Sequence, residues 1–326
     1  MQRFFGRMAI VLLAVLLTAG AIEQTYRVYL FGWSAFSYAR IDSVHDLWVS
    51  GLTRRAAEPE VAFELRPSLH SYFKLAPLRT DSRGLRDIER PLDAPPGTAR
   101  IAIVGSSFSM PAGVALEDAW HQVLARGLDA AAPDRRHEAI NFSVGGYSAR
   151  QLLAVLKTKV PAYRPELVLF EFTTHTPHLV YPDTFYTTPY VPGPRSHPFW
   201  SSFVLDRVRA QVAHAAPDFN PYPAERLAAM EAIMRDAARV SAEHGARLCF
   251  VILNMNQGGA ANAQSLAQAA ARHASCVIDT TPTFAGKSLA DLVIYPGDAH
   301  PNAKAQAIFA GTIAPRVAPL LARRPS

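Results

Sequence analysis

Three polar residues from two distant parts of the chain have the types needed for nucleophilic catalysis. Ser107 follows the short apolar run Ile101–Val104, and Asp298 and His300 stand one residue apart near the C-terminus. A serine hydroxyl becomes strongly nucleophilic when a histidine takes its proton and an acid orients that histidine. These residues together indicate a Ser-His-Asp site. Taken singly, Ser107 fits a turn, and Asp298 or Asn302 fits a helix cap.

The elements that must bring these residues together alternate between strands and helices. Short continuous apolar runs, typical of strands buried on both faces of a parallel sheet, lie at 100–104, 139–144, 167–172, 248–253 and 276–278. Helical stretches lie at 120–130, 149–160, 224–244, 263–273 and 302–321. The pattern predicts a doubly wound α/β fold with a sheet of about five parallel strands. Sites in such folds lie at the carboxyl ends of the strands.

The N-terminal segment, residues 1–33, predicts export. Arg3 and Arg7 precede an apolar run that extends from Met8 to Ile22, a little short of the roughly 20 residues of a spanning helix. A small-residue cleavage site at 19–21 is followed directly by aromatic residues that resemble an interfacial belt. We favour an uncleaved signal anchor over a cleaved signal peptide. The rest of the chain is then expected outside the cytoplasm, membrane-anchored on the periplasmic side, or secreted if the signal is cleaved.

The remaining chain divides into a lead-in and a main domain. Residues 34–98 show scattered aromatics without a sustained period, which predicts a small irregular lead-in that ends in the proline-rich stretch 91–96. Residues 99–326 form the α/β domain. It is interrupted at about 175–223 by a segment rich in proline and aromatic residues, too long for an ordinary strand-to-helix connection. This insertion is either a lid or substrate platform, or an excursion that packs against the lead-in.

Composition excludes several classes of protein. The 326 residues are 49% hydrophobic and 18% charged, so a disordered, collagen-like or coiled-coil chain is excluded. The net charge of +6 is spread over the length without a nucleic-acid-binding signature, so we expect no nucleic acid partner. Cys249 and Cys276 are too few for a disulfide framework and are interpreted as inert strand residues. Pro177 separates His175 from His178, and no nucleotide-binding loop is present, so neither a metal nor an organic cofactor is expected.

In order and spacing, four segments between about residues 80 and 320 resemble the blocks of the SGNH/GDSL hydrolase family. The run 101–108 is similar to the first block, with Ser106 in place of its aspartate and Ser107 in the nucleophile's place. The run 141–148 is similar to the second block. There Gly146 matches the glycine that gives an N–H to the oxyanion hole, and Gly145 is the near alternative.

The other two blocks depart from the family pattern. The run 171–176 lacks the asparagine of the third block, and Thr174 or His175 stands about where its side chain would be. Asp298 and His300 resemble the last block, Asp-x-x-His, with one intervening residue instead of two. Asp279, at the end of a predicted strand, is an alternative acid or a strand-end cap, and we favour the cap. The run 81–87 also resembles a lead-in of membrane-tethered members.

The resemblance implies an α/β/α, flavodoxin-like fold and an ester-cleaving site without a cofactor. Ser107 would attack the carbonyl, His300 would act as general base and then acid, and Asp298 would orient His300. The oxyanion hole would comprise the N–H groups of Ser107 and Gly146, with Thr174 or His175.

Three functions are consistent with these residues. The first is an exported serine esterase or deacetylase that acts on an O-acyl ester, of a small molecule or an envelope carbohydrate. The second is an O-acyltransferase that uses the same serine. The third is a non-catalytic carbohydrate-binding protein on a degenerate hydrolase fold, suggested by Ser106 and the missing asparagine.

Overall fold

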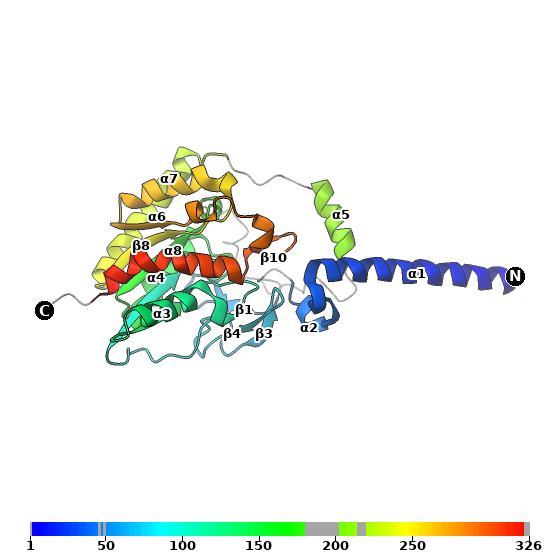
Figure 1. Ribbon diagram of the computed structural model, residues 1–326, viewed down its shortest axis with the longest axis horizontal. Coiled ribbons are helices and arrows are strands. Elements are labelled where there is room, and N and C mark those ends of the chain that lie inside the picture. Colours follow the sequence, from blue (N-terminus) through cyan, green and yellow to red (C-terminus); the bar gives the residue numbers. More distant parts are fainter. Residues whose placement is uncertain (1, 45–46, 48–49, 180–201, 214–219, 323–326) are drawn as a thin grey trace.

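A five-stranded parallel sheet forms the centre of the protein (Figure 1). The computed structural model describes residues 2–44, 47, 50–179, 202–213 and 220–322. The strands are β5 (Thr98–Val104), β6 (Arg136–Asn141), β7 (Leu167–Phe172), β8 (Arg247–Ile252) and β9 (Cys276–Asp279), in the order β6-β5-β7-β8-β9. All four pairings are parallel, which confirms the predicted fold. The strand order reverses between β5 and β7, where this kind of sheet leaves a crevice at its carboxyl edge.

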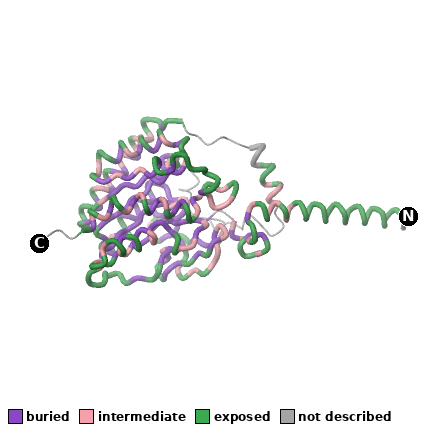
Figure 2. Tube along the Cα trace, viewed as in Figure 1, coloured by how far each residue is buried: buried purple, intermediate pink, exposed green. Residues whose placement is uncertain are grey.

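Helices cover both faces of the sheet. One face packs against α4 (Ala149–Thr158), α6 (Ala224–Glu243) and α7 (Ala260–Ala271), and the other against α3 (Trp120–Ala131) and α8 (Ala303–Leu321). Along β5, Ala102 and Val104 belong to the first core, whereas Ile101 and Ile103 belong to the second. Because successive side chains of a strand point to opposite faces, a strand buried on both faces is a continuous apolar run. Burial is accordingly concentrated in the sheet and the inner sides of the helices (Figure 2).

The lead-in contains two small hairpins that the sequence pattern did not predict. They are β1 (Thr53–Arg55) with β2 (Phe63–Leu65) and β3 (His70–Phe73) with β4 (Ala76–Arg79), both antiparallel. Strands of three or four residues are too short to display a clear alternation of apolar and polar side chains. Phe63, Leu65, Phe73 and Leu78 are buried in the same core as the α4 face of the sheet. The lead-in therefore packs directly on the α/β domain.

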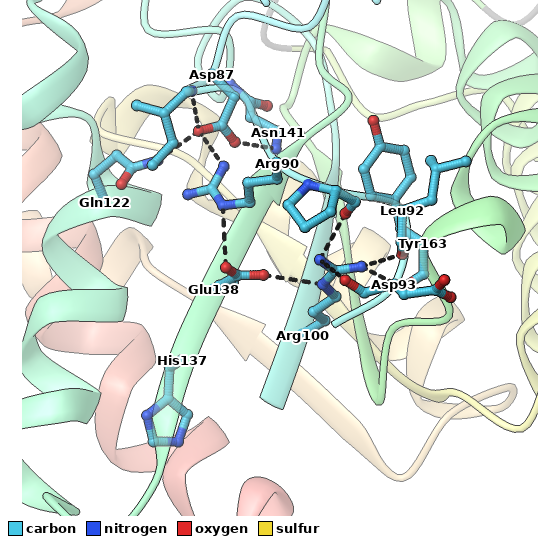
Figure 3. Close-up of polar contacts among 12 residues, drawn as sticks. Asp87, Arg90, Leu92, Asp93, Arg100, Gln122, His137, Glu138, Asn141 and Tyr163 are labelled. Carbon is cyan, nitrogen blue, oxygen red and sulfur yellow. Dashed lines mark hydrogen bonds and ion pairs between the residues drawn. The ribbon is translucent and has the colours of Figure 1, made fainter. Parts of the chain in front are cut away.

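A polar network fastens the end of the lead-in to the sheet (Figure 3). Asp87 accepts hydrogen bonds from the Asn141 N–H (2.9 Å) and the Gln122 side chain (2.9 Å), and pairs with Arg90 (2.5 Å). Burial raises the pKa of Asp87, and the Arg90 cation opposes that rise. The Arg100 Nε of β5 donates to Glu138 of β6 at 2.9 Å. The network thus holds residues 87–93 against two neighbouring strands.

The N-terminal helix α1 (Gln2–Phe31) projects away from the body (Figure 1). The segment that starts at Arg3 is long and apolar enough to cross a membrane or to act as a signal sequence, and its apolar window is fully exposed. A 3-10 turn, η1 (Gly32–Phe36), and the short α2 (Tyr38–Ile41) follow it. Within the predicted insertion, the structure describes η4 (Thr176–Leu179) and α5 (Phe203–Ala213). Residues 180–201 and 214–219, and with them most of the predicted lid or platform, lie outside the described residues.

The two cysteines, interpreted from sequence as inert, form a disulfide. Cys249 of β8 and Cys276 of β9 are register partners in adjacent parallel strands, with their Cα atoms 4.6 Å apart. The interpretation that they lie in strands is confirmed, and the interpretation of both as inert residues is corrected by the disulfide. Pairing depends on the strand order and register, which spacing along the chain does not reveal.

Removal of this disulfide is expected to lower the free energy of unfolding by about 3 kcal/mol, because the bond closes a loop between residues 27 apart in the unfolded chain. Urea unfolding of the Cys249→Ala/Cys276→Ala variant beside the oxidised and reduced native chain measures this. The variant should match the reduced chain. Equal stability of all three would show that the bond contributes nothing.

Candidate active site

A short hairpin near the C-terminus carries the predicted acid and base. It consists of β10 (Val293–Tyr295) and β11 (Asp298–Pro301), with Gly297 in its turn at φ +93°, where a side chain would be strained. Asp298 Oδ1 lies 2.5 Å from His300 Nδ1 and accepts the His300 backbone N–H at 2.9 Å. Because alternate residues of a strand point to the same side, one intervening residue suffices to align acid and base. Asn302 is the N-cap of α8, and Asp298 is not a helix cap.

Two further residues hold the other oxygen of Asp298. Lys74, in the two-residue turn of the β3–β4 hairpin, donates from Nζ to Asp298 Oδ2 at 2.7 Å, and the Tyr295 hydroxyl donates to the same atom at 3.1 Å. Burial favours the neutral acid, but the hydrogen bond and charge of His300 and the charge of Lys74 outweigh it and hold the pKa of Asp298 well below its usual range. Asp298 is therefore an ionised carboxylate with both oxygens bonded. One oxygen contacts His300, and the other is held by Tyr295 and by Lys74 of the lead-in.

Ser107 and His300 line one cavity of about 580 Å³ at the carboxyl edge of the sheet. Ser107 lies in the turn that follows β5, and the ring of the next residue, Phe108, has its centroid 6.1 Å from that of His300. The same cavity is lined by Gly146, Thr174, Lys74 and Asp298. Among the described residues no hydrogen bond joins Ser107 to His300; hydrogen bonds between a nucleophile and its base often tighten only when a substrate binds.

A buried carboxylate lies beneath the Ser107 turn. Glu171 Oε2 of β7 accepts the backbone N–H of Ser106 at 2.9 Å, and Oε1 accepts the Ser106 hydroxyl at 3.1 Å. A Cβ on Gly105 would lie only 2.1 Å from Glu171 Oε2, so the close approach requires glycine at that position. Ser106, which stands where the resemblance predicts an aspartate, is thus one half of a contact that fixes the turn containing Ser107. Sequence analysis missed Glu171 because it lies within an apolar strand.

The predicted oxyanion-hole residues also line the cavity. The Gly145 N–H donates to Met110 Sδ at 3.1 Å, whereas in the described part of the chain no acceptor is paired with the N–H of Ser107 or Gly146. Gly146 has a φ of +84°, which favours glycine. Of the two candidate glycines, Gly146 is therefore the one whose donor remains available to a substrate.

The segment after β7 forms a closed turn, without the asparagine that the resemblance would place there. Thr176 Oγ1 accepts the Thr173 N–H at 2.9 Å, and Thr173 Oγ1 accepts the His175 N–H at 3.2 Å. Thr174 and His175 both line the cavity, so both remain candidates for the third oxyanion donor. Asn254, which follows β8, lines it too, but its amide nitrogen donates to Asn256 O at 3.0 Å and Thr281 Oγ1 at 3.1 Å. Its side chain therefore links the loop after β8 to the turn after β9.

The predicted lead-in motif 81–87 contacts the segment that follows Ser107. Arg86 is almost fully buried and donates to the carbonyls of Met110 (2.5 Å), Pro111 (2.5 Å) and Val114 (2.5 Å). Burial lowers the pKa of the Arg86 guanidinium to about 10, and the charge of Glu117 opposes this. Because the bonded carbonyls follow Ser107 closely in the chain, Arg86 ties the lead-in to the segment that follows Ser107.

Loss of the Lys74 cation is expected to weaken the site. In Lys74→Met the pKa of Asp298 should rise toward its ordinary range, and kcat/KM for an ester should fall about 10- to 100-fold as the carboxylate loses a fixed partner. NMR acid titration of the Asp298 carboxyl and steady-state kinetics measure the two effects. Lys74→Arg, which keeps the cation, is the control and should lose less. An unchanged titration and rate in Lys74→Met would contradict this role.

Glu171 should leave a signature in the pH dependence of stability. Burial raises its pKa, against the opposing hydrogen bonds of Ser109 and Ser106, so the folded chain keeps this proton to higher pH than the unfolded chain. Glu171 therefore contributes to the free energy of unfolding in full below its ordinary pKa of 4.5. As the pH rises above that value, the contribution should decrease until Glu171 has ionised in the folded protein as well. Urea unfolding across this pH range should show a shallower decline in Glu171→Gln. Identical pH profiles would refute the assignment.

Comparisons with known proteins find similarity in fold only. No sequence-family profile matches the chain, and no curated protein matches it. Similar solved structures include TesA (16% identity, TM-score 0.46, covering 68% of this chain and 99% of that one). The psychrotrophic esterase EstA from Pseudoalteromonas sp. is 19% identical, with a TM-score of 0.44 over 67% of this chain and 96% of that one. A catalytic mutant of Axe2, an acetylxylan esterase from Geobacillus stearothermophilus, is 14% identical, with a TM-score of 0.45 over 67% and 94%.

Proposed function

We propose that the protein is a serine esterase or deacetylase of the SGNH type that cleaves O-acyl esters through Ser107, His300 and Asp298. The observation that carries the proposal is the 2.5 Å contact between Asp298 and His300 Nδ1, with His300 in the same cavity as Ser107. A non-catalytic relative has no need of a buried, doubly stabilised carboxylate behind a histidine that lines a cavity. The intact pair therefore favours an enzyme over a degenerate binding protein.

In the proposed mechanism, His300 Nε2 takes the proton of the Ser107 hydroxyl while the Ser107 oxygen attacks the ester carbonyl. Asp298 fixes the His300 tautomer by accepting from Nδ1, and stabilises the imidazolium that forms. The N–H groups of Ser107 and Gly146, with Thr174 or His175, stabilise the oxyanion. His300 then protonates the departing alcohol, and water activated by the same residue hydrolyses the acyl-serine.

The proposed location is outside the cytoplasm, with residues 1–33 as a signal anchor and the α/β domain on the periplasmic side. The exposed apolar surface of α1 supports an anchor, and the disulfide between β8 and β9 supports an oxidising compartment. An envelope carbohydrate bearing O-acyl groups would be accessible there. The lead-in 34–98 and the domain 99–326 would act together, because Lys74 belongs to the first and Asp298 to the second.

The test is acetate release from an aryl acetate and from an O-acetylated oligosaccharide by the full chain in detergent. Turnover well above that of buffer, with free acetate as the product, is the expected result. Acetate that appears only on an added sugar acceptor would identify a transferase. A folded protein that releases no acetate from either ester and acetylates no acceptor would refute the proposal.

A further inference from the structure

The helix α5 is attached to α1 where the apolar segment of α1 ends. Glu23, the first charged residue after that segment, accepts the backbone N–H of Phe203 at 3.0 Å and the Ser202 hydroxyl at 2.7 Å. Arg27, paired with Glu23 at 2.8 Å, lies over the Phe203 ring at 5.2 Å. When α1 is inserted in a bilayer, Glu23 lies at the boundary of the hydrocarbon. The N-terminus of α5 is then held at the membrane surface.

The outer side of α5 has the chemistry of a membrane-surface helix. Leu205 and Val208, one turn apart and so on the same face, are 55% and 52% exposed. Arg207 and Arg209 are exposed beside them, in a helix whose one acidic residue is Asp206. Exposed apolar residues flanked by arginines suit the surface of an anionic bilayer. Exposed aromatic residues, typical of that interface, follow α1 in the chain: Trp33, Phe36 and Tyr38.

The same end of α1 contacts the hairpin that carries the acid and base. Phe31 lies about two turns, or about 12 Å, beyond Glu23 along the helix. Its ring contacts Phe203 of α5 and Tyr295 of β10, each with centroids 5.1 Å apart. The Tyr295 hydroxyl donates to Asp298. Two contacts thus link Phe31 to Asp298, and Figure 1 shows α5 and β10 near the end of α1 that meets the body.

We propose that α5 is a second membrane contact and that the cavity faces the bilayer at close range, so that the ester is one carried by the membrane. The chemical class is an amphiphilic acyl ester whose acyl-bearing group lies at the lipid headgroups. This inference rests on the proposed ester cleavage for its substrate. For its membrane surface it rests on the proposed anchor α1, the α1–α5 contacts and the exposed residues of α5. The exposed face of α5 contacts the same bilayer that α1 spans.

The membrane contact is tested without reference to activity. The full chain, with an environment-sensitive fluorophore on Leu205→Cys, is placed in phosphatidylcholine–phosphatidylglycerol nanodiscs that contain spin-labelled lipids. Strong quenching is expected at this position. The control label, on Ala242→Cys near the end of α6 and at the amino edge of the sheet, should remain unquenched. Equal quenching at the two positions, or none at Leu205→Cys, would overturn the proposed surface.

The substrate class is tested with two esters that share one leaving group. In Leu205→Glu/Val208→Glu, hydrolysis of a long-chain aryl ester in the nanodisc should fall about ten-fold, whereas that of a soluble aryl acetate should not change. Ala242→Glu should alter neither rate. If this double substitution lowered the hydrolysis of both esters equally, the proposal that the cavity takes its ester from the membrane would be refuted. Quenching at Leu205→Cys without hydrolysis of either ester would refute the proposed function and leave the membrane contact standing.

Discussion

Replacement of Ser107 by alanine is expected to reduce kcat/KM for an ester by about 10⁴- to 10⁶-fold, because the nucleophile and its base act as a unit. In the described part of the chain the Ser107 hydroxyl forms no hydrogen bond, so the variant should unfold at the same urea concentration as the native chain. Kinetics with an aryl acetate, together with circular dichroism, measure activity and fold separately.

The neighbouring serine offers a matched control for this prediction. Ser106→Ala removes a hydroxyl one residue away that bonds to buried Glu171, and is expected to reduce activity far less than Ser107→Ala. If Ser106→Ala abolished turnover while Ser107→Ala retained it, the assignment of the nucleophile would be wrong.

The second large effect is expected from Asp298→Asn, which should lower kcat/KM by about 10⁴-fold. The side-chain amide that replaces the carboxylate can present its N–H₂ to His300 Nδ1, which would hold the ring in the wrong tautomer. It also leaves the Lys74 ammonium without its 2.7 Å anionic partner. Steady-state kinetics measure the loss, and it should appear in kcat as well as in kcat/KM.

Asp279→Asn is the matched control for Asp298→Asn. Asp279 ends strand β9 of the central sheet, but its Oδ1 accepts the Thr281 N–H at 2.9 Å and it does not line the cavity with Ser107. Its replacement should leave kcat/KM within a few-fold of the native value. A large loss in Asp279→Asn and none in Asp298→Asn would move the acid to β9.

The central sheet could be predicted because each strand is buried on both faces. The run Leu167–Phe172 coincides with β7, and the other four predicted runs overlap their strands. The second predicted run, 139–144, is shifted toward the C-terminus relative to its strand. β6 ends at Asn141, and residues 142–144 belong to the loop that leads to Gly146. Phe142 and Val144 are apolar and remain buried beyond the strand, so hydrophobicity alone could not locate its end.

The hairpins were not predictable from pattern, and they matter most to the site. Asp298–Pro301 contains hardly any apolar surface, so it gave no strand signal, although the short spacing of Asp298 and His300 fits a strand well. Lys74 meets Asp298 across 224 positions of the chain, and no local feature marks that contact. Glu171 was hidden for the opposite reason, since its neighbours in β7 are all buried and apolar.

The most direct test of the proposed chemistry is covalent capture of the nucleophile. The full chain in detergent is treated with a fluorophosphonate, which phosphonylates activated serines, and the modified residue is located by peptide mass spectrometry. We predict one adduct, on Ser107, and none in folded His300→Ala or Ser107→Ala. An unmodified native chain, or an adduct that persists in His300→Ala, would contradict a serine hydrolase built on Ser107, His300 and Asp298.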